Sequence, residues 1–316
     1  MQFTYGEWDN ISYSKKCALT FGNFDGVHLG HQSVLNALRQ NALRLSLPTV
    51  VVLFEPQPRE YFAVDKDLTR ISSLRDKLAC LKDLGVDAVF CLKFNDSLAQ
   101  CSASDFIQEV LFDRLKAQYI LIGEDARFGL ERQGDVELLF TKAHELGKKV
   151  TILANLKTND QRISSTIVRA ALKRGQFQVA QQCLGRPYSV IGRVAYGKNH
   201  GSKFGLPTLN LHIRNKYPPF NGVFSVHIVE DNGSITEGIA NWGLRPTVCG
   251  KKMVLEVHGF QLAKNLYGKL VKIIFLQKIR AEKQFASFAS LVEQIKRDIV
   301  IAKKFFTSLK EQQGNS

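Results

Sequence analysis

The chain has 316 residues, which is longer than one typical domain, and its 45% hydrophobic content suffices for two buried cores. Its formal net charge is +14, but the basic residues are spread along the chain without a basic tail or an arginine-rich arm. This pattern argues against a nucleic-acid-binding protein and favours a surface that attracts anionic nucleotides. The six cysteines lack the spacing of a zinc site or a disulfide framework. With no signal-peptide pattern and no apolar run that spans a bilayer, we expect a cytoplasmic protein without a membrane partner.

Strands and helices alternate in the first part of the chain, up to about residue 184. Short apolar segments predict strands at 18–21, 50–54, 88–92, 119–122 and 150–153. Helical spacing of apolar residues predicts helices between them, among others at 32–45, 75–84 and 103–115. This order indicates an α/β fold in which a parallel sheet is covered by helices on both faces.

After residue 185 the pattern changes to short β-rich segments that follow one another. They lie at 189–194, 208–213, 222–229, 235–240, 254–259 and 270–275. So many short strands in series predict a compact antiparallel β-barrel. The last segment, 285–309, has apolar residues at helical spacing and predicts a helix packed on that barrel. We therefore expect one domain at 1–184 and a second at 185–316.

The segment between the first strand and the first helix combines glycines with two histidines, in the order Gly22-Asn-Phe-Asp-Gly-Val-His-Leu-Gly-His31. The glycines permit a tight turn, so His28 and His31 are expected at the N-terminus of the helix. There the free N–H groups and the helix dipole attract anions, and two imidazoles can donate hydrogen bonds to oxygens that gain charge during phosphoryl or nucleotidyl transfer. The alternative is a pair of solvated loop histidines.

Three further loops in the first half lie where ligands bind in open α/β sheets, at the carboxyl ends of strands. They are residues 54–59, residues 123–129, which contain two acids and an arginine between glycines, and residues 162–169. The last loop places hydroxyls before a helix and an arginine in its first turns, so these groups can converge on a phosphate chain. Taken alone, it is also compatible with an ordinary helix cap and a solvated arginine.

In the second half, residues 197–210 combine glycines, lysines and a serine with Thr208 and Asn210. The glycines and lysines suit a flap over phosphates, and the hydroxyl and amide oxygens suit Mg²⁺ carried in by a nucleotide. A strand start with an Asx-type turn is the alternative for so short a motif. Glu256 lies among apolar neighbours on a predicted strand, where it serves either as a structural carboxylate or as a general base.

Nine ordered blocks together resemble the bacterial bifunctional riboflavin kinase/FAD synthetase family over nearly the whole chain. The resemblance implies a Rossmann-like nucleotidyltransferase α/β domain followed by a riboflavin-kinase β-barrel. It further implies two ATP-dependent reactions, phosphorylation of riboflavin to FMN and then adenylylation of FMN to FAD and pyrophosphate. The blocks are Gly22–His31, Phe54–Pro58, Gly123–Asp125 with Arg127–Gly129, Ile163–Thr166 with Arg169, Leu184–Tyr188, Gly205–Asn210, Asn241–Thr247, Leu266–Gly268, and Ile279 and Arg280 with Phe285.

The resemblance also implies roles for individual residues. Catalysis would rest on His28 and His31 in the adenylylating domain and on Glu256, as general base, in the kinase. Thr208 and Asn210 would hold Mg²⁺, and the partners would be small molecules only (ATP, riboflavin, FMN and FAD), with the oligomeric state left open. ATP and phosphate contacts in the first domain would come from Gly22, Asn23, Phe24, Asp25, Gly30, Asp125, Arg162, Ser164, Thr166 and Arg169. ATP and flavin contacts in the kinase would come from Gly197, Lys203, Gly205, Pro207, Thr208, Asn210 and Arg280.

Two positions depart from the pattern of the family. Ala126 stands where many relatives have a large aromatic residue, and Trp242 where a smaller apolar residue is more usual.

Two other functions are alternatives to this reading of the sequence. The intact Thr208, Asn210 and Glu256 argue against a monofunctional cytidylyl- or adenylyltransferase with a barrel that only binds, and the missing basic cluster and stacking motif argue against a non-catalytic nucleic-acid-binding protein.

Overall fold

The computed structural model describes residues 1–62, 69–158, 161–195, 207–213, 218–247, 250–262 and 266–314. Its contacts divide the chain into two compact units, which are described separately. The first consists of Met1–Leu68 and Lys77–Ser165, and the second of Thr69–Asp76 and Thr166–Ser316. Among the described residues, no helix combines the length and the apolar content that a membrane span requires.

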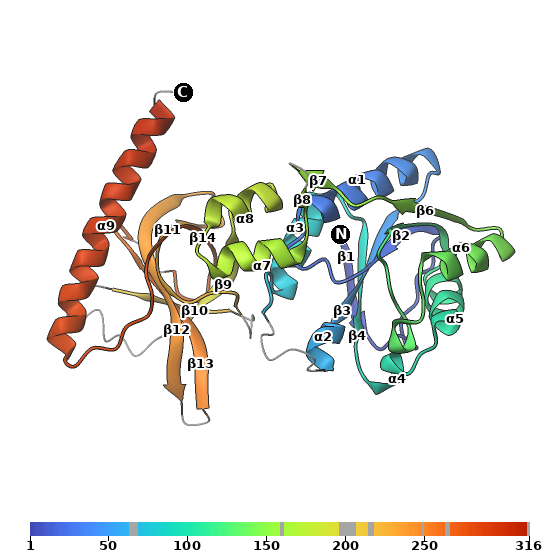
Figure 1. The fold of residues 1–316 in the computed structure, drawn as a ribbon, viewed down its shortest axis with the longest axis horizontal. Helices are drawn as coiled ribbons and strands as arrows, with labels where there is room; N and C mark the ends of the chain where they lie inside the picture. Colours follow the sequence, from blue (N-terminus) through green and yellow to red (C-terminus); the bar gives the residue numbers. More distant parts are fainter. Residues whose placement is uncertain are drawn as a thin grey trace. The chain divides into compact units, whose positions relative to one another are not determined.

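A six-stranded parallel sheet forms the centre of the first unit, in the order β1-β4-β3-β2-β5-β6 (Figure 1). All five strands predicted for this unit are confirmed to within two residues at each end. The edge strand β1 comes in addition, because its mixed polar and aromatic residues give no apolar run. The strands are β1 Gln2–Gly6, β2 Cys17–Phe21, β3 Thr49–Glu55, β4 Ala88–Lys93, β5 Ala117–Gly123 and β6 Lys149–Leu153.

Helices cover both faces of this sheet, as predicted. On one face α1 (Leu29–Arg44) packs its Leu38 against Ala18 and Tyr119 of the sheet. On the other face the apolar side chains of η1 and α6 pack against Leu19 and its neighbours. The remaining elements are α2 Pro58–Tyr61, α3 Leu74–Asp83, α4 Asp96–Ala99, α5 Ala103–Asp105, the π-helix η1 Phe106–Arg114, the 3₁₀-helix η2 Leu130–Arg132, α6 Val136–Glu145, β7 Lys157–Thr158 and β8 Gln161–Arg162.

The second unit contains a closed antiparallel barrel in the order β10-β13-β12-β11-β14-β9, which confirms the predicted architecture (Figure 1). Aromatic rings fill much of its core, with Phe220 in contact with Phe224, Trp242 and Phe275. Trp242 is therefore a core residue of the barrel. The strands are β9 Ser189–Ala195, β10 Leu209–His212, β11 Gly222–Val229, β12 Ile235–Thr247, β13 Gly250–Gly259 and β14 Leu270–Arg280.

Two helices before the barrel share its core. α7 (Ser165–Lys173) and α8 (Phe177–Leu184) bury Leu172 and Phe177 in the same cluster as the barrel aromatics. The contacts therefore divide the chain between residues 165 and 166. This division lies ahead of the boundary expected at 185, which stays a prediction about where the two activities separate.

The segment Thr69–Asp76 also belongs to the second unit. Tyr188 donates its hydroxyl to the carbonyl of Ile71 at 2.9 Å, and the amide of Ile191 donates to a carboxylate oxygen of Asp76 at 2.8 Å. Burial of the Asp76 carboxyl raises its pKa, although the hydrogen bonds from Ser73 and Ile191 oppose this effect. This buried, hydrogen-bonded carboxyl fixes the segment to β9.

The terminal helix α9 (Phe288–Gly314) packs against β11, β12 and β14 (Figure 1). Its Ala302 and Phe306 are buried against Ile239 of the barrel, with Ile295 and Ile299 alongside. These are the apolar positions whose helical spacing predicts the packing face, so this prediction is confirmed.

Candidate functional site

His28 and His31 lie at the N-terminus of α1, as predicted, although the helix begins at Leu29, three residues earlier than expected. His28 is the N-cap, and its Nδ1 accepts a hydrogen bond from the backbone N–H of His31 at 3.3 Å. The two imidazoles stack with their centroids 3.7 Å apart and an interplanar angle of 17°. With His28 only 6% exposed, the pair is not a pair of solvated loop histidines.

The loop that precedes α1 is held in an unusual backbone conformation. Phe24 and Val27 adopt left-handed φ values of 45° and 43°, which cost free energy for residues that carry a Cβ. The ring of Phe24 lies 4.9 Å from that of His31. The ammonium of the fully buried Lys77 donates a hydrogen bond to the backbone carbonyl of Asn23 at 2.8 Å. Packing and a charged hydrogen bond thus fix the loop in place.

A cavity of about 300 Å³ opens at this loop and is called the histidine cavity here. It brings together the histidine pair, the end of β5 and the residues just before α7, as expected for the carboxyl ends of parallel strands. Three other predicted residues are not among those that line the cavity. Asp25 is buried, and its backbone carbonyl accepts a hydrogen bond from the hydroxyl of Ser165 at 3.0 Å. Thr166 and Arg169 lie on α7 in the second unit. Predicted residues that line the cavity are Gly22, Asn23, Phe24, His28, Gly30, His31, Asp125, Arg162 and Ser164.

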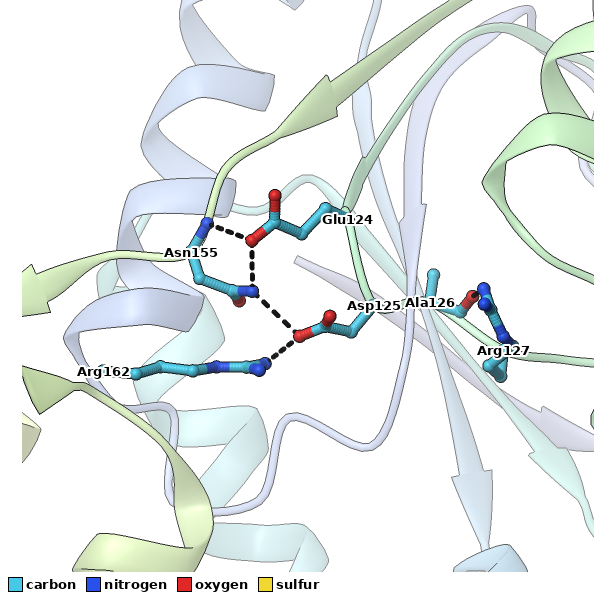
Figure 2. A network of polar contacts seen from close by, with 6 residues as sticks. All are labelled: Glu124, Asp125, Ala126, Arg127, Asn155 and Arg162. Carbon is cyan, nitrogen blue, oxygen red and sulfur yellow. Dashed lines mark hydrogen bonds and ion pairs between the residues drawn. The ribbon is translucent and has the colours of Figure 1, made fainter.

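Three residues that line the histidine cavity, Asp125, Asn155 and Arg162, belong to a network of polar contacts (Figure 2). The side-chain amide of Asn155 donates to Glu124 at 2.5 Å and to Asp125 at 2.8 Å, and its backbone N–H also donates to Glu124 at 3.2 Å. Arg162 forms an ion pair with Asp125. Figure 2 shows Asn155 between the two carboxylates, whereas Arg127 points away from them. The predicted residues Asp125 and Arg162 are thus paired with one another.

Asn155 was not predicted as a candidate site residue from the sequence, although it comes two residues after β6. Its position at the carboxyl end of a parallel strand is the same signal that singles out the loops after β3 and β5. The signal was missed because an asparagine between two leucine-containing segments carries no recognisable motif.

A second cavity, called the aromatic cavity here, has a volume of about 760 Å³. Burial raises the pKa of the Cys101 thiol on its wall to about 11, so this thiol is neutral and acts as an apolar surface. Arg59, from the predicted loop 54–59, and Arg127 also line the cavity. The aromatic residues on its wall are Phe21, Phe54, Phe62, Phe94, Phe106 and Phe128.

The histidine cavity and the aromatic cavity share a wall. Phe21, Gly22, Asn23 and Ala126 line both of them. Ala126 contributes only a methyl group to the wall between a polar cavity and an apolar one. Together the two cavities suit a ligand pair in which phosphates meet next to a planar ring system.

In the barrel, the predicted kinase residues Asn210 and Glu256 face each other directly across β10 and β13. Asn241 of β12 is the partner of Glu256 on its other side. Because Leu255 and Val257 point into the core, Glu256 and its two partners lie on the outer face of the barrel. Gly197, Lys203 and Gly205 of the predicted flap lie outside the described residues.

Thr208 and Pro207 come just before β10, whose first residue is Leu209. A ring nitrogen of His258 lies 2.8 Å from the carbonyl oxygen of Pro207, which ties this segment to β13 near Glu256. Thr208, Asn210 and Glu256 therefore lie in one region of the barrel, and their hydroxyl, amide and carboxylate oxygens are hard donors of the kind that fits Mg²⁺. Within the described part of the chain, no cluster of histidine, cysteine and acidic residues offers another metal site.

Arg280, at the end of β14, contacts the terminal helix. Its Nε lies 3.1 and 3.0 Å from the two carboxylate oxygens of Asp298, and its Nη2 completes the pair at 2.9 Å. Its guanidinium also lies 5.6 Å from the centroid of the Phe285 ring. Arg280 therefore has a structural role, in which it links β14 to the terminal helix through Asp298. Its role in ATP or flavin binding stays a prediction.

Comparisons with known proteins agree with both halves of this description. A family model described as FAD synthetase matches residues 10–167, and one described as riboflavin kinase matches residues 184–306. The bifunctional riboflavin kinase/FMN adenylyltransferase of Haemophilus influenzae is 43% identical over 92% of this chain and 95% of its own length. That of Escherichia coli K12 is 41% identical over 92% and 93%.

One solved structure matches nearly the whole chain. The crystal structure of a protein named a macrolide-efflux protein, from Streptococcus pneumoniae, covers 96% of this chain and 99% of its own with a TM-score of 0.77 and 27% sequence identity. Both units therefore have counterparts in one experimentally determined chain. On the two family models and on relatives of this identity and coverage, the chain belongs to the family of bifunctional riboflavin kinase/FMN adenylyltransferases.

Proposed function

We propose that this bifunctional riboflavin kinase and FMN adenylyltransferase carries out adenylyl transfer in the first unit, with ATP in the histidine cavity and the flavin ring of FMN in the aromatic cavity. The observation that supports this most directly is the wall that the two cavities share at Phe21, Gly22, Asn23 and Ala126. It brings a phosphate-binding surface next to an apolar surface of aromatic rings, where the phosphate of FMN meets that of ATP.

The chemistry of adenylyl transfer requires no nucleophile from the enzyme. A phosphate oxygen of FMN forms a bond to the α-phosphorus of ATP while the bond from that phosphorus to the pyrophosphate oxygen breaks. His28 accepts a hydrogen bond at Nδ1, so its neutral ring carries a proton on Nε2 and remains a donor. We propose that both histidines donate to oxygens that gain charge, and that Ser164 and Arg162 contact the leaving pyrophosphate.

We further propose that riboflavin kinase activity resides at the outer face of the barrel, around Asn210 and Glu256. Glu256 accepts the proton of the riboflavin 5′-hydroxyl while that oxygen forms a bond to the γ-phosphorus of ATP and ADP leaves. The cross-strand pairing of Asn210 with Glu256 supports this role, because it puts the general base beside the oxygen donors. Mg²⁺ held by Thr208 and Asn210 would neutralise charge on the ATP phosphates.

We also propose a cytoplasmic location. The free thiols of Cys17, Cys101 and Cys183 agree with a reducing compartment.

The division of labour is tested with the full chain, riboflavin, ATP and Mg²⁺, by separating the flavin products chromatographically. We expect His31→Ala to stop at FMN, with FAD formation reduced at least about 100-fold, the size of effect that one lost charge-stabilising donor produces. Glu256→Gln should form little FMN from riboflavin but should make FAD at the wild-type rate when FMN is supplied. A similar loss of both activities in either variant would contradict the assignment.

A further inference from the structure

The second-last residue of strand β2 is a threonine, Thr20, whose hydroxyl has no hydrogen-bond partner among the described residues. Thr20 is 1% exposed, and no atom of the described chain lies within hydrogen-bonding distance and geometry of its Oγ1. A buried hydroxyl without a hydrogen bond is unfavourable, and it occurs rarely in folded proteins. Thr20 therefore calls for an explanation that the folded chain alone does not provide.

The position of Thr20 supplies that explanation. Side chains alternate along β2, so Thr20 lies on the same face as Ala18, which packs against Leu38 of α1. Thr20 is two residues nearer the carboxyl end of the strand, and it lines the histidine cavity together with His28 and His31. Thr20 therefore lies beside the N-terminus of α1, a place where anions bind.

A second unpartnered atom lies in the same cavity. The side-chain oxygen of Asn23 is also buried and has no hydrogen-bond partner within the described structure, although its backbone carbonyl is bound by Lys77. Two polar groups that the fold leaves unsatisfied on one cavity wall indicate that a polar ligand completes their hydrogen bonds.

We propose that Thr20 is a substrate-binding residue of the adenylyl-transfer site, and that its hydroxyl donates a hydrogen bond to a phosphate oxygen of a substrate bound in the histidine cavity. This inference rests on the proposed function of that cavity. A hydroxyl suits the position because it is neutral and costs less to bury than a lysine or arginine when the cavity is empty. The triphosphate of ATP is the expected source of the phosphate oxygen, and the phosphate of FMN is the second source.

The test compares three variants of the full chain. Thr20→Val keeps the shape and the β-branching of the side chain but removes the hydroxyl, whereas Thr20→Ser keeps the hydroxyl. Tyr119→Phe is the matched control, because Tyr119 is also buried on the α1 face of the sheet with an unpartnered hydroxyl, but it does not line the histidine cavity. For each variant we would measure KM for ATP at saturating FMN, KM for FMN at saturating ATP, and calorimetric binding of α,β-methylene-ATP.

We expect Thr20→Val to weaken binding of the ATP analogue and to raise KM for ATP by roughly 10- to 100-fold, the effect of one lost hydrogen bond to a charged group. A rise confined to KM for FMN would support the same hydrogen bond with the flavin phosphate as its acceptor. Thr20→Ser and Tyr119→Phe should stay within a few-fold of the wild type. Riboflavin phosphorylation should be unchanged throughout. The free energy of unfolding of Thr20→Val in urea should equal or exceed that of the wild type, because the substitution removes a buried hydroxyl that has no hydrogen bond in the folded chain.

Two results would overturn the proposal. One is a Thr20→Val variant with wild-type binding and both KM values unchanged. The other is an equal loss in Tyr119→Phe, which would show that any buried hydroxyl on this face affects the site. If His31→Ala formed FAD at the wild-type rate, the assignment of the histidine cavity to adenylyl transfer would fail, and that failure is distinct from a failure at Thr20 alone.

Discussion

At the scale of single residues, the position of the histidine pair depends on how closely Gly30 packs against it. A Cβ built at Gly30 would lie 3.1 Å from Cε1 and Nδ1 of His28 and 3.4 Å from the carbonyl oxygen of Ile163. Gly30→Ala should therefore displace the His28 ring, although alanine is favoured over glycine in a helix by about 1 kcal/mol. We expect FAD formation to fall at least about 10-fold while the free energy of unfolding changes by less than about 1 kcal/mol.

The control is Asn36→Ala, an exposed position of the same helix where alanine also raises helix propensity. Activity assays with FMN and ATP, together with urea unfolding, separate the two effects. Wild-type adenylylation in Gly30→Ala would show that the site tolerates movement of His28, and the proposed role of its ring would be wrong.

The same residues show what a sequence reveals about a site and what it does not. The position of His28 and His31 at the start of a helix was predicted correctly, because a local glycine pattern and the start of one helix determine it. Thr20 and Asn155 were not predicted, since their surroundings arise from neighbouring strands that are distant in sequence. The aromatic cavity was missed because the phenylalanines on its wall come from separate segments, although Phe54 and Phe128 lie in predicted ligand loops.

At the scale of elements, the helix α9 is attached to the barrel by apolar packing and by one buried ion pair. Asp298 is 1% exposed, and Arg280 and Gln294 donate hydrogen bonds to it. Asp298→Ala would leave the guanidinium without its partner and an empty space under the helix. We expect a loss of about 3 kcal/mol in the free energy of unfolding of the second unit.

The matched control is Glu293→Ala, one turn earlier on the same helix. Its carboxylate pairs with Arg297, but both side chains are 66% exposed, so the expected loss is below about 1 kcal/mol. Urea unfolding monitored by circular dichroism measures both variants. Equal losses would show that burial of the Asp298 pair contributes nothing beyond an ordinary surface interaction.

Element prediction succeeded where a periodic pattern was strong and failed where it was weak. The series of β-rich segments located all six barrel strands, but β12, β13 and β14 extend four to seven residues beyond the predicted ends. Helical spacing of apolar residues located α9 to within five residues at each end. β7 and β8, with two residues each, are too short to carry a pattern. The sequence predicts a helix after the hydroxyls of loop 162–169, but it contains no information about which of the two cores the apolar faces of α7 and α8 enter.

At the scale of the whole molecule, the core that α7 and α8 enter decides where the chain can be divided into fragments that fold. Six apolar side chains of α7 and α8 are buried in the core of the barrel unit, namely Val168, Ala171, Leu172, Phe177, Ala180 and Leu184. A fragment 186–316 would expose the surface that they cover. Because each large apolar side chain contributes about 1.5–3 kcal/mol when buried, their loss is comparable to the whole stability of about 5–15 kcal/mol of a typical domain.

We therefore expect fragment 166–316 to fold and to phosphorylate riboflavin, whereas fragment 186–316 should be insoluble or unfolded. Fragment 166–316 still lacks residues 69–76, which bind Tyr188 and Ile191 in the full chain, so it should unfold at a lower urea concentration than the second unit does there. Solubility, circular dichroism and the formation of FMN from riboflavin and ATP measure the outcome. If fragment 186–316 were as stable and as active as fragment 166–316, α7 and α8 would be dispensable to the barrel, and the division at residue 185 would describe the folding units as well as the activities. If both fragments folded but neither made FMN, the first unit would have to supply part of the kinase site, and the assignment of that activity to the barrel would be wrong.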